Sequence, residues 1–157
     1  MLRSALSALA CALPAPVAEA HCDGPCGVYD PASARVAAEA VLSMTKKLKA
    51  MVAPSAGDAA ALAAYNNTFG RYVAIKEEEA QKTKKELLIL WTDYFKPDHL
   101  ATFPDLHDTF WKAAKLCSAC KVNIDQAKAE ELMAAVEKIH GMFWQSKGRS
   151  DAWVTAS

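Results

Sequence analysis

Apolar residues recur along this chain at alternating steps of three and four, the spacing of one face of an α-helix. The first such stripe follows Asp30-Pro31, a pair typical of a helix start, with an acidic N-cap and proline at the first helical position. Residues 54–57 contain proline and glycine and end this helix, and Asp58 can cap the next one. The stripe of the first helix consists of Val36, Ala40, Met44, Leu48 and Val52.

A second stripe is much longer and predicts one long helix that ends before Pro97, with Gly70 as the position for a bend. Its members are Leu62, Tyr65, Phe69, Tyr72, Lys76, Ala80, Thr83, Leu87, Leu90 and Tyr94. We interpret its apolar and aromatic side chains, like those of the other helices, as core residues.

Two further helices are expected in the last third of the chain, one starting near Pro104 and one opening at Asn123 or Asp125. Their inward faces carry Leu106, Phe110, Ala113 and Cys117 in the first helix, and Leu132, Val136, Ile139 and Phe143 in the second. No stretch has the period of a strand. Four amphipathic helices with short loops predict an all-α, antiparallel four-helix bundle over residues 31–147.

Length and composition agree with a soluble globular domain. The chain has 157 residues, of which 52% are hydrophobic and 23% charged. Lys plus Arg and Asp plus Glu both number 18, so overall charge gives no reason to expect nucleic acid or an anionic membrane as a partner. Residues 148–157 are expected to form a loose tail with Trp153 as its only anchor.

Residues 1–20 have the features of a cleaved leader or propeptide. Arg3 gives a small positive region, an apolar run too short to cross a bilayer follows, and Ala18-Glu19-Ala20 is a processing signature. The alternative is an ordinary apolar segment that stays attached. A leader is compatible with export, with an organelle or thylakoid route, or with maturation in the cytoplasm, and the sequence does not choose between them.

Cleavage after Ala20 would place a metal hook, residues 21–30, at the new N-terminus. The free amine of His21, the amide nitrogen of Cys22 and the Cys22 thiolate lie in sequence, so a metal bound to all three closes two five-membered rings. The turn at Gly24-Pro25 can bring the Cys26 thiolate to the fourth corner. Planar nitrogen and sulfur ligation indicates nickel(II) or copper(II), with the His21 imidazole in reach of an axial position.

This donor set also suggests redox chemistry. Anionic thiolates and a deprotonated amide stabilise trivalent nickel, and a metal that cycles between two states can oxidise one superoxide and reduce the next. A Cys22–Cys26 disulfide is an alternative. A structural zinc site is a second alternative. Such a site needs four side-chain ligands, and no further ligands lie near the hook in sequence.

The segment from His21 to Pro31 resembles the nickel hook of nickel-containing superoxide dismutases. A second block, Leu90 to His99, is similar to that family's other signature, and the resemblance extends from His21 to about Lys147. It implies disproportionation of superoxide to dioxygen and hydrogen peroxide, one nickel ion per subunit, a maturation protease, and a homohexamer with the hooks placed among subunits.

The resemblance also implies roles for the hook residues. His21 would give its amine and imidazole to nickel, Cys22 its amide nitrogen and thiolate, and Cys26 its thiolate. Pro25 would follow a cis peptide bond that tightens the hook.

Four further residues take roles from the resemblance. Tyr29 would stand at the mouth of the site as a gatekeeper for small anions and water, with Tyr94 as a second phenol behind it. Asp23 and Lys96 would hold the hook against the helices. For Tyr94 and Lys96 the alternative is simple packing at a helix end.

One departure concerns the side chains around the metal-binding imidazole. In the family, a glutamate of the first helix and an arginine of the second buttress it, whereas the aligned positions here are Ala37 and Glu79. Glu79 could accept the His21 N–H from the opposite wall. Alternatively, Glu79 belongs to the acidic run 77–79 and faces water.

The remaining histidines and cysteines have simpler interpretations. His99 is expected in a loop, and His107 and His140 at helix surfaces or in packing. Cys117 and Cys120 share a helix face, which favours two buried thiols over a metal or redox pair.

Three functions therefore compete. The first is superoxide disproportionation at nickel, the second is a non-catalytic protein that binds or delivers nickel or copper, and the third is an exported helical protein with a disulfide. Tyr29 and the block from Asp93 to Lys96 favour the enzyme, because a chelator needs neither. The uncleaved chain is expected to be inactive.

Overall fold

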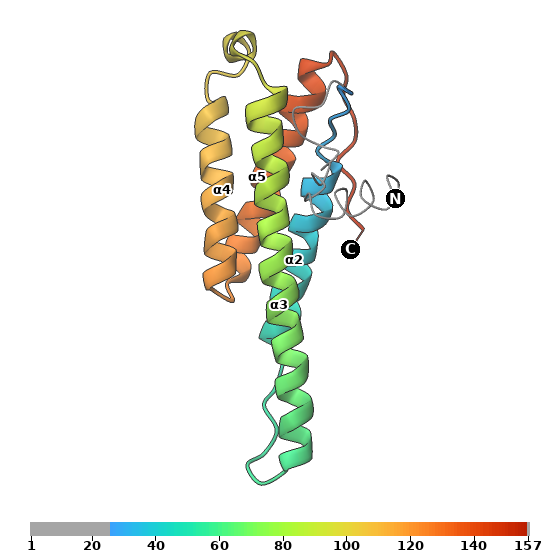
Figure 1. Cartoon of the computed structure of the whole chain (residues 1–157), viewed down its shortest axis with the longest axis vertical. Helices are drawn as coiled ribbons and strands as arrows, with labels where there is room; N and C mark the ends of the chain where they lie inside the picture. Colours follow the sequence, from blue (N-terminus) through green and yellow to red (C-terminus); the bar gives the residue numbers. More distant parts are fainter. Residues whose placement is uncertain (1–25, 157) are drawn as a thin grey trace, which may run out of the picture.

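The computed structural model describes residues 26–156, which form an up-and-down bundle of four long helices (Figure 1). The helices are α2 (Ala32–Ala50), α3 (Ala59–Ile89), α4 (Leu106–Val122) and α5 (Gln126–Ser146). Within this range no strand is present, and no helix combines the length and apolarity needed to cross a membrane. The predicted all-α class is confirmed.

Acidic side chains begin three of the four helices. Asp30 Oδ1 accepts a hydrogen bond from the Ala32 N–H at 2.7 Å, and Asp58 Oδ1 accepts one from Ala61 at 2.9 Å. Asp125 accepts from two N–H groups in the first turn of α5. These bonds satisfy backbone donors that the start of a helix leaves without partners, as the sequence predicts.

The long helix does not continue unchanged to Pro97. After Ile89 the chain forms a π-helix, η1 (Leu90–Tyr94), and then a short 3₁₀-helix, η2 (Pro97–Ala101). The Phe95 N–H donates to the Leu90 carbonyl at 3.0 Å, which closes the wider π turn. Single π turns are rare and often occur at functional sites.

The core lies where all four helices pack together. Its largest fully buried apolar side chains include Phe110, Phe143, Leu87, Leu106, Leu132 and Ile139. Cys117 and Cys120 belong to the same cluster. The stripes predicted for the last two helices are therefore core faces.

The first half of α3 extends beyond the other helices (Figure 1), and we call residues 51–72 the projecting arm. The buried residues of α3 all come later in the helix: Lys76, Ala80, Thr83 and Leu87. On the arm, Leu62 is 48% exposed, and the Tyr65 and Phe69 rings stack on each other 6.0 Å apart. This part of the predicted stripe is thus outside the core of a single chain.

The C-terminal tail lies against α2 and α5 through several contacts. The Trp153 ring lies 5.3 Å from that of His140, whose Nε2 is 3.1 Å from the Asp151 carbonyl oxygen. The Ala156 N–H donates to Glu39 Oε1 at 2.7 Å. Trp153 is therefore one anchor among several.

Candidate metal centre

The described chain begins at Cys26, immediately before the segment that leads into α2. The Cys26 thiol is free and exposed. Gly27 follows with φ +64°, a left-handed conformation that favours glycine, and turns the backbone toward Tyr29. The other predicted hook residues, His21, Cys22, Asp23 and Pro25, lie outside the described residues. Between residues 26 and 156, no three His, Cys, Asp or Glu side chains converge as a metal site.

Tyr29 and Tyr94 lie together at this end of the bundle. Their ring centroids are 5.5 Å apart, and both rings pack on the edge of the core. Tyr29 comes from the segment before α2, whereas Tyr94 is the last residue of the π-helix. The structure therefore brings together the two phenols that the sequence motifs predict, from positions far apart in the chain.

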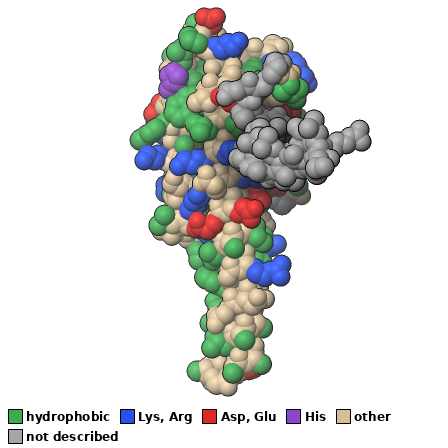
Figure 2. All heavy atoms as spheres, in the orientation of Figure 1, with side chains coloured by type: hydrophobic (Ala, Val, Ile, Leu, Met, Phe, Trp, Pro, Cys, Tyr) green, Lys and Arg blue, Asp and Glu red, His purple; other side chains and the backbone are tan. Residues whose placement is uncertain are grey.

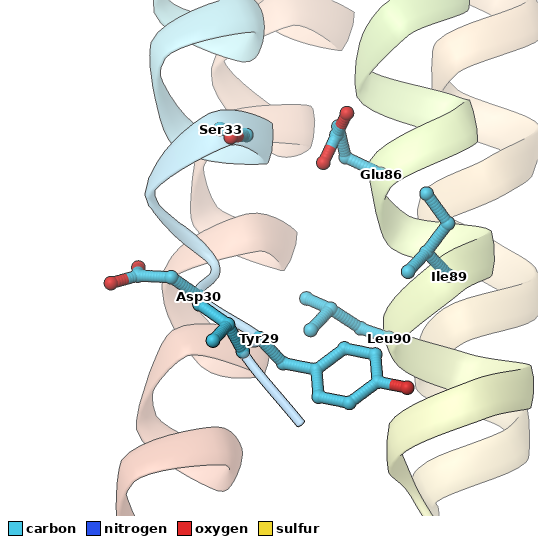
Figure 3. A pocket seen from close by; sticks show the side chains of 7 residues that line it. Tyr29, Asp30, Ser33, Glu86, Ile89 and Leu90 are labelled. Atoms are coloured by element: carbon cyan, nitrogen blue, oxygen red, sulfur yellow. The ribbon is translucent and has the colours of Figure 1, made fainter. Parts of the chain in front are cut away.

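A small pocket opens beside Tyr29, between the start of α2 and the end of α3 (Figure 3). Its volume is about 70 Å³, which is room for a few water molecules. The Glu86 side chain extends from α3 toward the side of the pocket where Ser33 lies (Figure 3). Its lining comprises Val28, Tyr29, Asp30, Ser33, Glu86, Ile89 and Leu90.

The Tyr94 ring is held on several sides. The Phe143 ring centroid is 4.6 Å away, His99 stacks on Tyr94 at 5.8 Å, and the Lys147 Nζ lies 5.2 Å from the centre of the Tyr94 ring. The phenol oxygen is 2.6 Å from the Ser146 Oγ at the end of α5. Tyr94 is thereby fixed by both the chain that follows η1 and the last helix.

Lys96 lies next to this cluster with an exposed side chain. Its backbone N–H donates to the His99 Nδ1 at 2.9 Å, and this bond helps to start η2. His99 thus has a structural task beyond that of a loop residue, which sequence reasoning missed. His107 and His140 take part in packing as expected, with His107 accepting a hydrogen bond from the Trp91 indole at 2.9 Å.

Glu79 and Ala37, the two positions that depart from the family pattern, lie deeper along the bundle. Ala37 is fully buried, and the Glu79 side chain is 24% exposed with Lys82 Nζ 4.0 Å from it. Fifteen residues of helix separate Glu79 from Tyr94, a rise of roughly 20 Å. Glu86 is one heptad after Glu79 on the same helix and is the α3 carboxylate that lines the pocket beside Tyr29.

Cys117 and Cys120 are buried in the core, as predicted. Burial raises the pKa of the Cys117 thiol to about 12, and the neighbouring Cys120 adds to this shift. Burial also raises the pKa of Cys120 to about 11. Both remain neutral thiols at physiological pH, and neither has the character of a reactive thiolate.

A free cysteine and two packed phenols thus lie together at one end of the helical bundle, beside the start of α2. The family description for nickel-containing superoxide dismutase matches residues 16–147. The chain belongs to this family.

Individual relatives agree with the family match. Superoxide dismutase [Ni] of Streptomyces seoulensis is 37% identical over 131 residues, covering 82% of this chain and 88% of the relative. The enzyme of the same name from Streptomyces coelicolor is 36% identical over 128 residues, with the same coverage.

Solved structures show the same fold. A native nickel superoxide dismutase superimposes with a TM-score of 0.69 at 35% identity, covering 81% of this chain and 99% of the other. A structure with nickel ligation of the oxidised state also gives 0.69, at 38% identity, covering 82% and 99%. Family membership confirms the sequence prediction of a nickel-dependent superoxide dismutase, an oxidoreductase with nickel as its cofactor.

Proposed function

We propose that this protein disproportionates superoxide to dioxygen and hydrogen peroxide at a nickel ion held by His21, Cys22 and Cys26, once residues 1–20 have been removed. The observation that carries the proposal is the position of Cys26. Its free, exposed thiol lies three residues before Tyr29, whose ring packs 5.5 Å from that of Tyr94.

The Cys26 side chain is a suitable ligand for nickel. A thiolate is a soft, anionic ligand, and Cys26 is neither buried nor engaged in a disulfide. The nickel ion, when bound, supplies one electron to a superoxide and takes one from another by alternating between its divalent and trivalent states. The N-terminal amine and imidazole of His21 and the amide nitrogen and thiolate of Cys22 complete the proposed ligand set.

The protein side chains control what reaches this ion. Tyr29 lines the pocket of about 70 Å³, and its phenol is a group that can hydrogen-bond to small anions and water. Tyr94 supports it from behind through their ring contact. Asp23 and Lys96 hold the N-terminal segment to the bundle; the exposed Lys96 side chain at this end supports that role.

Cleavage by a maturation protease is part of the proposal. Before cleavage, the His21 nitrogen is an amide bonded to Ala20 and a poor ligand, so the uncleaved chain has no activity. A chain verified to retain residues 1–20 that nevertheless removes superoxide rapidly would overturn this point.

The central test uses chains that begin at His21, loaded with nickel and assayed for superoxide decay by pulse radiolysis. We expect turnover together with sulfur-to-nickel charge-transfer absorption, and loss of both in Cys22→Ser and in Cys26→Ser, because a hydroxyl is much harder to deprotonate. Cys117→Ser, in the core of the bundle, is the matched control. Tight nickel or copper binding without turnover would instead support a binding or delivery protein.

We also propose that the enzyme is a homo-oligomer, a hexamer by family resemblance, in which the projecting arm contacts a second copy of this chain. The support is the exposure of apolar side chains on the arm, where Leu62 is 48% and Val52 is 85% exposed. Figure 2 shows hydrophobic side chains at the surface of this part of the molecule. Sedimentation velocity tests this proposal. We expect Leu62→Glu to shift the assembly toward smaller species, whereas Val122→Glu, at an 83% exposed position on α4, should not. A monomeric wild type would refute it.

A further inference from the structure

Ser146 makes two short hydrogen bonds at the end of α5. Its Oγ lies 2.6 Å from the phenol oxygen of Tyr94 and 2.6 Å from the backbone carbonyl oxygen of Phe143. The hydroxyl is half-buried, and both partners belong to the aromatic cluster around Tyr94. The three groups form a continuous chain of hydrogen bonds from the phenol to the helix backbone.

The chemistry of the three groups decides which of them donates and which accepts in these two hydrogen bonds. A carbonyl oxygen can only accept, and a serine hydroxyl has one hydrogen to donate. Phe143 is among the last four residues of α5, whose carbonyls lack the usual helical partner. The Lys147 N–H, the next candidate donor, goes to Trp144 instead at 3.1 Å.

Ser146 therefore donates its hydrogen to Phe143, and the Tyr94 hydroxyl must donate to Ser146. A phenol that has used its one hydrogen keeps only lone pairs on its oxygen. The Tyr94 ring cannot easily turn away from this arrangement, because Phe143 lies 4.6 Å from it and Phe95 meets it edge-on at 5.0 Å.

We propose that Ser146 is a positioning residue, which holds Tyr94 as a hydrogen-bond acceptor at the site. This inference rests on the proposed function of the site beside Tyr29. Tyr94 then receives a hydrogen bond from an O–H group, such as that of water or of the hydrogen peroxide product. In this arrangement Tyr94 is not the group that donates a proton to peroxide.

A spectroscopic test needs neither nickel nor turnover. The two bands of the tyrosine Raman doublet change their intensity ratio according to whether the phenol donates or accepts a hydrogen bond. Subtracting the spectrum of Tyr94→Phe from that of the full chain isolates Tyr94. We expect a donor signature, its loss in Ser146→Ala, and its return in Ser146→Thr, which keeps the hydroxyl. The signature of a phenol that accepts without donating, or no change in Ser146→Ala, would overturn the assignment.

A kinetic test asks whether this hydrogen bond matters for the reaction. In the matured, nickel-loaded enzyme, Ser146→Ala should lower kcat/KM by about tenfold, the scale of a lost positioning contact, while Ser146→Thr retains activity. In a Tyr94→Phe background, Ser146→Ala should have no further effect, because the group that it positions is already gone. Ser118→Ala on α4, which also removes a hydroxyl bonded to its own helix, is the matched control.

The two tests separate this inference from the proposed function. Full activity of Ser146→Ala would refute the positioning role, as would additive losses in the double variant. If the wild type shows no dismutase activity at all while the Raman result holds, the proposed function fails and the hydrogen-bond direction stands. Circular dichroism and thermal melting of Ser146→Ala exclude unfolding as the cause of any loss.

Discussion

The Lys76 Nζ on α3 lies 2.5 Å from the Cys120 carbonyl oxygen on α4, although the residues are 44 positions apart. The same ammonium group is 2.7 Å from the Lys121 carbonyl oxygen, and the residue is only 2% exposed. Burial lowers the pKa of Lys76, and Glu77 partly opposes that shift. A side chain from one helix thus satisfies the carbonyls that the end of another leaves without partners.

Replacement of Lys76 should therefore destabilise the bundle. Lys76→Met leaves these carbonyls without their charged donor, and we expect a loss of about 2–4 kcal/mol in the free energy of unfolding. Urea denaturation followed by circular dichroism measures it. Lys82→Met, which changes a lysine whose side chain is 50% exposed, is the control and should cost far less. Equal effects of the two substitutions would contradict the capping role.

The two buried thiols predict a dependence of stability on pH. Their pKa values rise from 9.0 to about 12 for Cys117 and about 11 for Cys120, so unfolding releases protons once the pH exceeds 9.0. Their contribution to stability is complete below that pH and is lost as the pH rises toward the folded-state values. Each thiol makes the free energy of unfolding fall by at most about 1.4 kcal/mol for each pH unit in this range.

Urea unfolding of the wild type and of a Cys117→Ala, Cys120→Ala double variant, measured from pH about 8 to about 10.5, tests this linkage. We expect the stability of the wild type to fall more steeply above pH 9 than that of the variant. Parallel curves would show that the thiols do not titrate differently in the two states.

The Tyr29→Phe substitution should affect the entry of small anions to the site but not the binding of nickel. Without the hydroxyl the ring still packs on Tyr94, so nickel should stay bound while control over small anions at the pocket weakens. Nickel content, measured by elemental analysis, and the concentration dependence of azide inhibition check the two halves of this expectation. Loss of nickel in Tyr29→Phe would make Tyr29 a structural residue rather than a gatekeeper.

We propose that Glu79 orients the His21 imidazole, and Glu86, which lines the pocket beside Tyr29, is the competing carboxylate. Glu79→Gln should then reduce turnover by about 10-fold or more and change the spectrum of the oxidised nickel, while both thiolates still bind the metal. Glu86→Gln is the matched comparison, since it changes the α3 carboxylate that lines the pocket beside Tyr29. An effect confined to Glu86→Gln would transfer the role to Glu86 and leave Glu79 as a surface charge.

Local signals predicted the positions of the helices well. The stripe predicted for the first helix was wrong as a buried face, since Val36 is 51% and Val52 is 85% exposed. Asp30, Asp58 and Asp125 act within three residues of their own position, so the sequence alone is enough to recognise them. The π turn at Leu90–Tyr94 was not predicted, because it follows no sequence period and depends on packing against the rest of the bundle. Lys76 falls on the predicted inward stripe, but the carbonyls that it binds come from another helix and could not be inferred.

In the candidate site, too, local sequence signals were predictive and contacts between distant segments were not. Tyr29 and Tyr94 were found because each lies in a short, continuous sequence motif. Ser146 was missed because its importance lies in a contact 52 residues away in sequence, and Glu86 because nothing in the sequence shows which carboxylate of α3 lies beside Tyr29. A heptad spacing from Glu79 was the one signal that could have suggested Glu86.

The bond between Tyr94 and Ser146 has a consequence for the order of events during synthesis. Ser146 ends the last helix, and the tail beyond it reaches back to α2, where Ala156 binds Glu39 across 117 positions. The N-terminal segment leaves the ribosome first, yet the residues that order its surroundings are translated last. The groups that hold the Tyr94 ring and hydroxyl, Phe143 and Ser146, therefore become available only once α5 has been made, so Tyr94 is ordered well after α3 has left the ribosome.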